Sequence, residues 1–194
     1  MTRAPAPPLH RTKLLRGRQP SDAVTRRYAP LVTAKPDITL RHATVDDLGE
    51  IITVQRAAFL IEAQLYGHPN LPPLSETIDE ARAVLDDGVT AVVVAELVRP
   101  VGPRLVGVIR VAVVDSVAHI GRLAVAPDLM GSGIGSRLLQ YVHDNPPAGT
   151  ERFTLYTAHK SVGNQRWYTG HGYRPVSTVT DELGIEVVAM ERPL

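Results

Sequence analysis

The chain is organised around the stretch His119-Ile-Gly-Arg-Leu-Ala-Val-Ala-Pro-Asp-Leu-Met-Gly-Ser-Gly-Ile-Gly-Ser-Arg-Leu-Leu139, in which an apolar strand and a glycine-rich turn precede an amphipathic helix. Gly131, Gly133 and Gly135 stand at every second position where this helix begins. Residues without a Cβ let a ligand approach the backbone, and the first N–H groups of a helix have no partner inside it. Together with the helix dipole, these amides predict an anion site, most often for phosphate.

The helix after the turn has one apolar face. Its apolar residues recur at the spacing of a helical stripe, which comprises Ile134, Leu138, Leu139 and Val142. The run Asn145-Pro146-Pro147 is expected to end the helix, because proline cannot continue it. The helix is therefore predicted to bury this stripe and to present its N-terminus to the anion.

Three kinds of phosphate-binding turn compete for this segment. A dinucleotide fingerprint requires G-x-G-x-x-G after the first strand of a βαβ unit, whereas the spacing here is G-x-G-x-G, two-thirds of the way along the chain. A P-loop ends in Gly-Lys-Ser/Thr, and the segment contains no lysine. The third kind fits, because the segment resembles motif A of the GNAT superfamily of acetyl-CoA-dependent N-acyltransferases. In that motif a strand of the Leu-Ala-Val-x-Pro type precedes Arg/Gln-x-x-Gly-x-Gly/Ala.

The match to motif A has one departure. The family motif falls on Met130-Gly131-Ser132-Gly133-Ile134-Gly135, with Leu123-Ala124-Val125-Ala126-Pro127 before it. Met130 stands where the family usually has Arg or Gln, so this position offers a backbone amide but no side-chain donor.

A second motif lies about 30 residues further on, at Ser161-Val-Gly-Asn-Gln-Arg-Trp-Tyr-Thr-Gly-His-Gly-Tyr173. It is similar to the closing signature of the same family. The matching residues are Asn164, Tyr168, Gly172 and Tyr173, while Ser161 replaces an Asn that some members have. The resemblance covers roughly residues 38–194.

The resemblance implies a mixed αβ (α+β) fold, the GNAT fold, with a central twisted and mostly antiparallel sheet, splayed between strands 4 and 5 and flanked by about four helices. Apolar alternation predicts strands at 38–41, 90–98, 105–114, 117–125, 152–157, 174–179 and 185–190. Capping boxes at Thr44-x-x-Asp47 and Thr77-x-x-Glu80 predict helices up to Tyr66 and to 86–88, a further helix is expected near 163–171, and 67–73 is predicted as a rigid loop.

The resemblance also implies that acetyl-CoA is the cosubstrate. No metal is expected, because His68, His159 and His171 do not have the spacing of metal ligands. Pantetheine would lie against the free amides of Leu123 and Val125, and the pyrophosphate would meet the amides from Gly131 to Ser136. The full set expected to bind the coenzyme is Leu123, Ala124, Val125, Met130, Gly131, Ser132, Gly133, Ile134, Gly135, Ser136 and Asn164.

Acetyl transfer requires an amine that has lost its proton and a proton for the departing thiolate. Tyr168 matches the family's acid, and the alternative is a core aromatic residue beside Trp167. His119 is our candidate base because imidazole titrates near neutral pH, although a structural role for His119 and a proton relay through water are the alternatives. Glu62 and Tyr66 are expected to contact the acceptor, and the alternative for Glu62 is a solvated helix charge.

Charge divides the 194 residues into two parts. Residues 1–36 contain eight Lys and Arg, one Asp and six prolines, which predicts a disordered basic tail, with an organelle transit peptide as the alternative. Residues 37–194, the predicted acetyltransferase domain, contain 13 basic and 19 acidic residues. We expect a cytoplasmic protein without a membrane or nucleic-acid partner. The absence of Cys excludes disulfides, a thiolate nucleophile and Cys-ligated metal.

The sequence thus predicts an N-acetyltransferase that moves the acetyl group from acetyl-CoA to a primary amine of a small molecule. Acetylation of a protein N-terminus or lysine is one alternative, and a non-catalytic acyl-CoA-binding sensor is another. Because homodimers are common among similar proteins, a homodimer is an open expectation.

Overall fold

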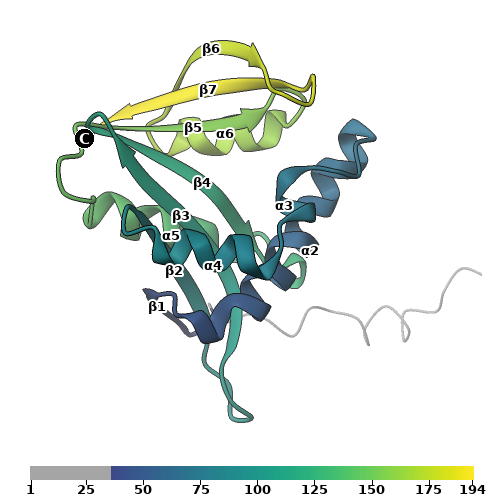
Figure 1. Cartoon of the computed structure of the whole chain (residues 1–194), viewed down its shortest axis with the longest axis vertical. Helices are drawn as coiled ribbons and strands as arrows, with labels where there is room; N and C mark the ends of the chain where they lie inside the picture. Colours follow the sequence, from purple (N-terminus) through teal and green to yellow (C-terminus); the bar gives the residue numbers. More distant parts are fainter. Residues whose placement is uncertain (1–35) are drawn as a thin grey trace, which may run out of the picture. The chain divides into compact units, whose positions relative to one another are not determined.

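A single seven-stranded sheet organises residues 36–194, which are the residues that the computed structural model describes; the predicted basic tail lies outside them except for its last residue (Figure 1). The strand order is β1-β2-β3-β4-β5-β7-β6. Neighbouring strands are antiparallel except β4 and β5, which run parallel, so the predicted α+β class is confirmed. The strands are β1 (Ile38–His42), β2 (Thr90–Leu97), β3 (Arg104–Val114), β4 (Val117–Val125), β5 (Arg152–Ala158), β6 (Arg174–Thr180) and β7 (Glu186–Pro193).

The helices fall where the sequence predicts them, with two short additions at 72–75 and 127–129. The predicted rigid loop at 67–73 is wrong at its end, because Pro72 and Pro73 open the short helix α3. Proline suits a first helical turn, where its missing N–H would have no partner. No helix within 36–194 is both long and apolar enough to cross a bilayer. The helical elements are η2 (Val45–Asp47), α2 (Leu48–Tyr66), α3 (Pro72–Ser75), α4 (Ile78–Asp86), η3 (Pro127–Leu129), α5 (Ile134–Asp144) and α6 (Val162–Gly170).

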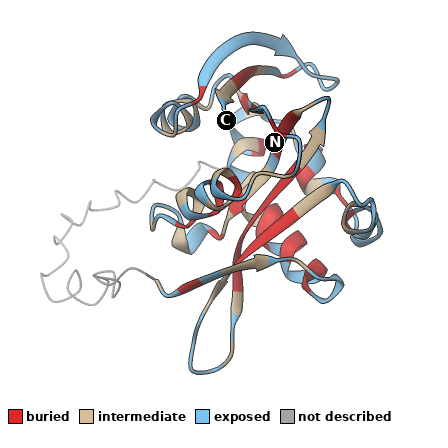
Figure 2. Cartoon of the chain, turned by 90° about the vertical axis from the view of Figure 1, so that its left-hand side faces the viewer, coloured by how far each residue is buried: buried red, intermediate tan, exposed pale blue. Residues whose placement is uncertain are grey.

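The two faces of the sheet are covered by different helices (Figures 1 and 2). On one face, α5 buries the predicted stripe of Ile134, Leu138, Leu139 and Val142. On the other face, α2 packs on β3 and β4, and α4 packs on β2. Successive side chains of a strand point to opposite faces of the sheet, so that Val93 faces α5 while its neighbour Val94 faces α2.

The sheet opens between β4 and β5. These strands pair only from Val117↔Arg152 to Ile120↔Leu155. Immediately afterwards the β3–β4 register shifts, and Arg122 adopts a φ of +52°. This is the geometry of a β-bulge, which bends its strand. The predicted splay between the fourth and fifth strands is therefore confirmed, and the second half of β4 has one free edge.

Candidate active site

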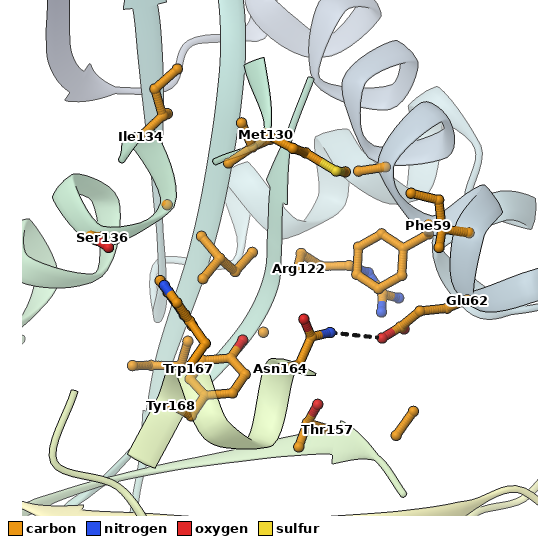
Figure 3. Close-up of a pocket in the computed structure, with 18 of the residues that line it drawn as sticks. Phe59, Glu62, Arg122, Met130, Ile134, Ser136, Thr157, Asn164, Trp167 and Tyr168 are labelled. Carbon is orange, nitrogen blue, oxygen red and sulfur yellow. Dashed lines mark hydrogen bonds between the residues drawn. The ribbon is translucent and has the colours of Figure 1, made fainter. Parts of the chain in front are cut away.

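A cavity of about 580 Å³ lies at this opening, within the size range of small-molecule sites (Figure 3). Its walls come from α2, β4, the glycine-rich turn, β5 and α6. Most residues predicted for the site line it: Glu62, Leu123, Val125, Met130, Gly131, Gly133, Ile134, Gly135, Ser136, Asn164 and Tyr168.

The glycine-rich turn leaves backbone donors without partners at the start of α5. Gly131 and Gly133 have φ values of +80° and +88°, which residues with a Cβ rarely adopt. Within 36–194, the N–H groups of Ile134, Gly135 and Ser136 donate no backbone hydrogen bond, as expected for a first helical turn. The turn therefore supplies both the amides and the dipole of an anion site.

The free edge of β4 supplies more donors. The N–H of Ala126 donates to the carbonyl of Val106 on β3 at 2.8 Å. Because N–H groups alternate in direction along a strand, the amide of Val125 points away from β3, toward the opening, and so does that of Leu123. These two amides are the ones predicted to contact the coenzyme.

Two residues of the predicted coenzyme set do not line the cavity. Ala124 is buried against α2, on the face opposite its neighbours Leu123 and Val125. The Ser132 hydroxyl instead donates to the carbonyl of Leu129 and closes the turn after η3.

Tyr168 projects from α6 into the cavity (Figure 3). Its ring packs edge-on against Trp167, with the centroids 4.9 Å apart, and no residue of 36–194 hydrogen bonds to its hydroxyl. Burial raises the pKa of this phenol, and the negative charge of Glu62 raises it further. Tyr168 therefore carries its proton at neutral pH and is able to donate it.

Glu62 faces Tyr168 from the C-terminal part of α2. Its Oε1 accepts a hydrogen bond from Asn164 Nδ2 at 3.1 Å (Figure 3). The same oxygen accepts a second hydrogen bond from Ser161 Oγ at 3.2 Å. Burial raises the pKa of this carboxyl above its usual value, although the two hydrogen bonds act in the opposite direction. The contact joins a residue predicted for the acceptor to one predicted for the coenzyme.

Tyr66, the other residue predicted to contact the acceptor, lies outside the cavity lining. Its hydroxyl accepts a hydrogen bond from the N–H of Lys160 at 2.6 Å, and the ammonium of Lys160 lies 4.9 Å from its ring centroid. Tyr66 thus ties the end of α2 to the loop between β5 and α6.

The structure does not bring His119 to the site. His119 lies in the first half of β4, between Ala112 of β3 and Thr154 of β5, and its side chain is exposed outside the cavity lining. The opening begins only after Ile120, where the pairing with β5 stops. No group of three His, Cys, Asp or Glu side chains within 36–194 is placed to hold a metal.

Arg122, which belongs to neither sequence motif and was not predicted for the site, lines the cavity from the bulge (Figure 3). Its Nε is buried without a hydrogen-bond partner among residues 36–194. Burial lowers the pKa of the guanidinium, and the nearby charge of Arg110 also lowers it while Glu76 raises it. The available signal was an arginine among the apolar residues of the second half of the strand, from Gly121 to Val125.

Comparisons with known proteins agree with this geometry. The model of the acetyltransferase (GNAT) domain family matches residues 75–194. The curated UPF0157 protein YqkA of Bacillus subtilis is 29% identical over 150 residues, which are 75% of this chain. The chain spans about 40% of the length of that relative.

Solved structures show the same fold at low identity. PaiA N-acetyltransferase from Thermoplasma acidophilum, in complex with coenzyme A, matches with a TM-score of 0.59 and 18% identity over 81% of this chain and 99% of that one. Spermidine N-acetyltransferase from Vibrio cholerae, in complex with CoA and spermine, matches with a TM-score of 0.64 and 17% identity over 80% and 95%. The Escherichia coli ribosomal-protein-S18-alanine N-acetyltransferase matches with a TM-score of 0.62 and 15% identity over 81% and 94%.

Proposed function

This chain belongs to the GNAT acetyltransferase family, and from that premise we propose that it is an N-acetyltransferase acting on a primary amine of a small molecule, with acetyl-CoA as its cosubstrate. The observation that carries the proposal is the cavity at the β4–β5 opening. There the unpaired amides of the glycine-rich turn and of β4 share one space with a protonated Tyr168 and with Glu62.

In this proposal the coenzyme runs along the free edge of β4. The amides of Ile134, Gly135 and Ser136 bind its pyrophosphate, which carries the negative charge that a helix N-terminus favours. The amides of Leu123 and Val125 bind the pantetheine chain and the thioester carbonyl. A hydrogen bond to that carbonyl stabilises the negative charge that develops on its oxygen during attack.

The reaction requires one proton acceptor and one proton donor. Glu62 takes the proton of the acceptor ammonium, because its carboxylate lines the cavity and burial raises its pKa. The neutral nitrogen attacks the thioester carbon, so that a C–N bond forms and the C–S bond breaks. Tyr168 donates its proton to the departing sulfur, and the proton that the nitrogen then loses restores the phenol through solvent.

Comparing the wild type with the variant Tyr168→Phe tests this function. Thiol release from acetyl-CoA in the presence of an amine library measures turnover, and calorimetry with coenzyme A measures binding. We expect kcat to fall by about 10²-fold, the range of one proton-transfer group, while the Kd for coenzyme A stays within about twofold.

Two results would overturn the proposal. A wild-type chain that ignores millimolar coenzyme A has no coenzyme site. A chain that binds coenzyme A but releases no thiol with any amine is the non-catalytic sensor.

A further inference from the structure

The cavity has charged side chains of opposite sign on two of its walls. Arg122 enters from β4 and Glu62 enters from α2 (Figure 3). We infer that the acceptor is an amino acid or a similarly small amino compound with an anionic group beside its amine, and that Arg122 binds the anion while Glu62 binds the ammonium. This inference rests on the acetyl transfer proposed above.

The backbone holds Arg122 in an unusual conformation. Its φ of +52° lies in the left-handed region, which costs a residue with a Cβ on the order of 1 kcal/mol or more. The bulge coincides with the point where β4 leaves β5, so the conformation places this residue at the opening rather than in the paired sheet. Strained residues of this kind concentrate at binding sites.

The protein leaves the charge of Arg122 without a partner among residues 36–194. The acidic residue close to it is Glu76, which accepts two hydrogen bonds from Arg110. Nη1 donates to Oε1 at 2.6 Å and Nη2 donates to Oε2 at 3.0 Å. The same Oε2 also accepts Gln55 Nε2 at 2.6 Å. Glu76 is therefore committed to a buried ion pair, and the three charges of Glu76, Arg110 and Arg122 sum to +1.

A partly buried guanidinium without a counter-ion is unfavourable, because burial removes water and nothing replaces it. An anionic ligand would relieve this cost. A carboxylate is the matching partner, since its two oxygens accept two parallel N–H groups of a guanidinium.

Glu62 provides the complementary half of the site. Both hydrogen bonds that it accepts from Ser161 and Asn164 go to Oε1, and within 36–194 nothing donates to Oε2. That oxygen is available to an ammonium group. With Glu62 and the net +1 cluster around Arg122, the walls carry no net charge, which suits a zwitterion.

A polyamine is the opposite case. It carries several cations and no anion, so it would leave Arg122 unpaired and place an additional positive charge near it. The same cavity therefore predicts discrimination against polyamines and against amines that lack an anion.

Matched acceptors test the inference. For several side chains, kcat/KM is measured by thiol release with the L-α-amino acid, its carboxamide and the amine that lacks the carboxyl group. The variants are Arg122→Gln, Arg122→Lys and, as a matched control, Arg152→Gln. Arg152 is an exposed residue at the start of β5 outside the cavity. Comparing each acceptor between variant and wild type cancels the intrinsic reactivity of its amine.

We expect the wild type to prefer the amino acid. Arg122→Gln should lower kcat/KM for amino acids by about 10- to 100-fold, the range of a charged hydrogen bond, and change it by about twofold or less for carboxamides and amines. Arg122→Lys should recover part of the loss, and Arg152→Gln should change nothing. The melting temperature of Arg122→Gln should not fall, because the guanidinium makes no hydrogen bond or ion pair within residues 36–194 that the substitution would remove.

The outcomes separate this inference from the proposed function. Equal losses for all three acceptor types, or a wild type that prefers spermidine, would refute the role of Arg122 while acetyl transfer stands. A wild type that acetylates no acceptor in the panel or in the amine library would refute both.

Discussion

The two halves of β4 have different tasks. From Val117 to Ile120 the strand is paired on both sides, with β3 and with β5, and it holds the sheet together. From Gly121 to Val125 it is bulged and has lost β5, and this half lines the cavity with both amides and side chains. The composition of the two halves is similar. The difference therefore comes from register and pairing, so a residue near the site in sequence can still lie outside it in space.

Replacing Glu62, the proposed proton acceptor in the cavity beside the unpaired half of β4, should have the largest effect on activity. Glu62→Gln keeps the shape of the side chain but cannot accept a proton, so we expect kcat/KM to fall by about 10²-fold or more. Calorimetry should give an unchanged Kd for coenzyme A. An activity within a few-fold of the wild type would move the proton-acceptor role away from Glu62.

The pH profile sharpens the same test. Because Glu62 must be ionised to accept a proton, wild-type kcat/KM should decrease as the pH falls through its pKa, which burial places above the usual value for Glu. The ratio of wild-type to Glu62→Gln activity cancels the titration of the amine. This ratio should decrease toward acid pH, and a ratio independent of pH would contradict the assignment.

The second test addresses the anion site at the end of the unpaired half. Gly133 has a φ of +88°, and Ala at this position would be strained by about 1–3 kcal/mol. We expect Gly133→Ala to displace the amides after it and to raise the Kd for coenzyme A by about tenfold or more in calorimetry.

Gly49→Ala in α2 is the matched control for Gly133→Ala. Gly49 lies in a helix, and a Cβ added there would meet no atom within 4 Å. The affinity of the Gly49→Ala variant for coenzyme A should therefore equal that of the wild type. Equal affinities in both variants would show that the turn does not bind the coenzyme.

Sequence reasoning succeeded where the signal is local. The turn at Gly131–Gly135 and the apolar stripe of α5 follow from spacing alone, since a helix start and a buried face require few neighbours. It failed where the result depends on pairing across the sheet. The conformation of Arg122 depends on the shift in the β3–β4 register, and His119 lies outside the site because β4 is still paired with β5 at that residue. Neither the register nor the pairing can be predicted from the sequence of β4 alone.

The third test measures how closely α5 packs on the sheet. A Cβ at Gly107 of β3 would lie 2.9 Å from Leu138 Cδ1, 3.1 Å from Ile134 Cγ2 and 3.3 Å from the carbonyl oxygen of Ala124. Gly107→Ala therefore pushes α5 away from the sheet and should lower the free energy of unfolding by about 1–2 kcal/mol, as overpacking does. Denaturant titration measures this change, and an unchanged midpoint would show that α5 adapts without strain.

The smallest expected effect is the one that most directly distinguishes the two halves of β4. His119 is exposed in the paired half and lies outside the cavity lining, so His119→Ala should leave kcat/KM within about twofold and unfolding within about 0.5 kcal/mol of the wild type. Thiol release and denaturant titration on the same preparation measure both quantities. A large loss of activity with unchanged stability would mean that β4 shifts its register when coenzyme binds, since only such a shift carries this side chain to the opening.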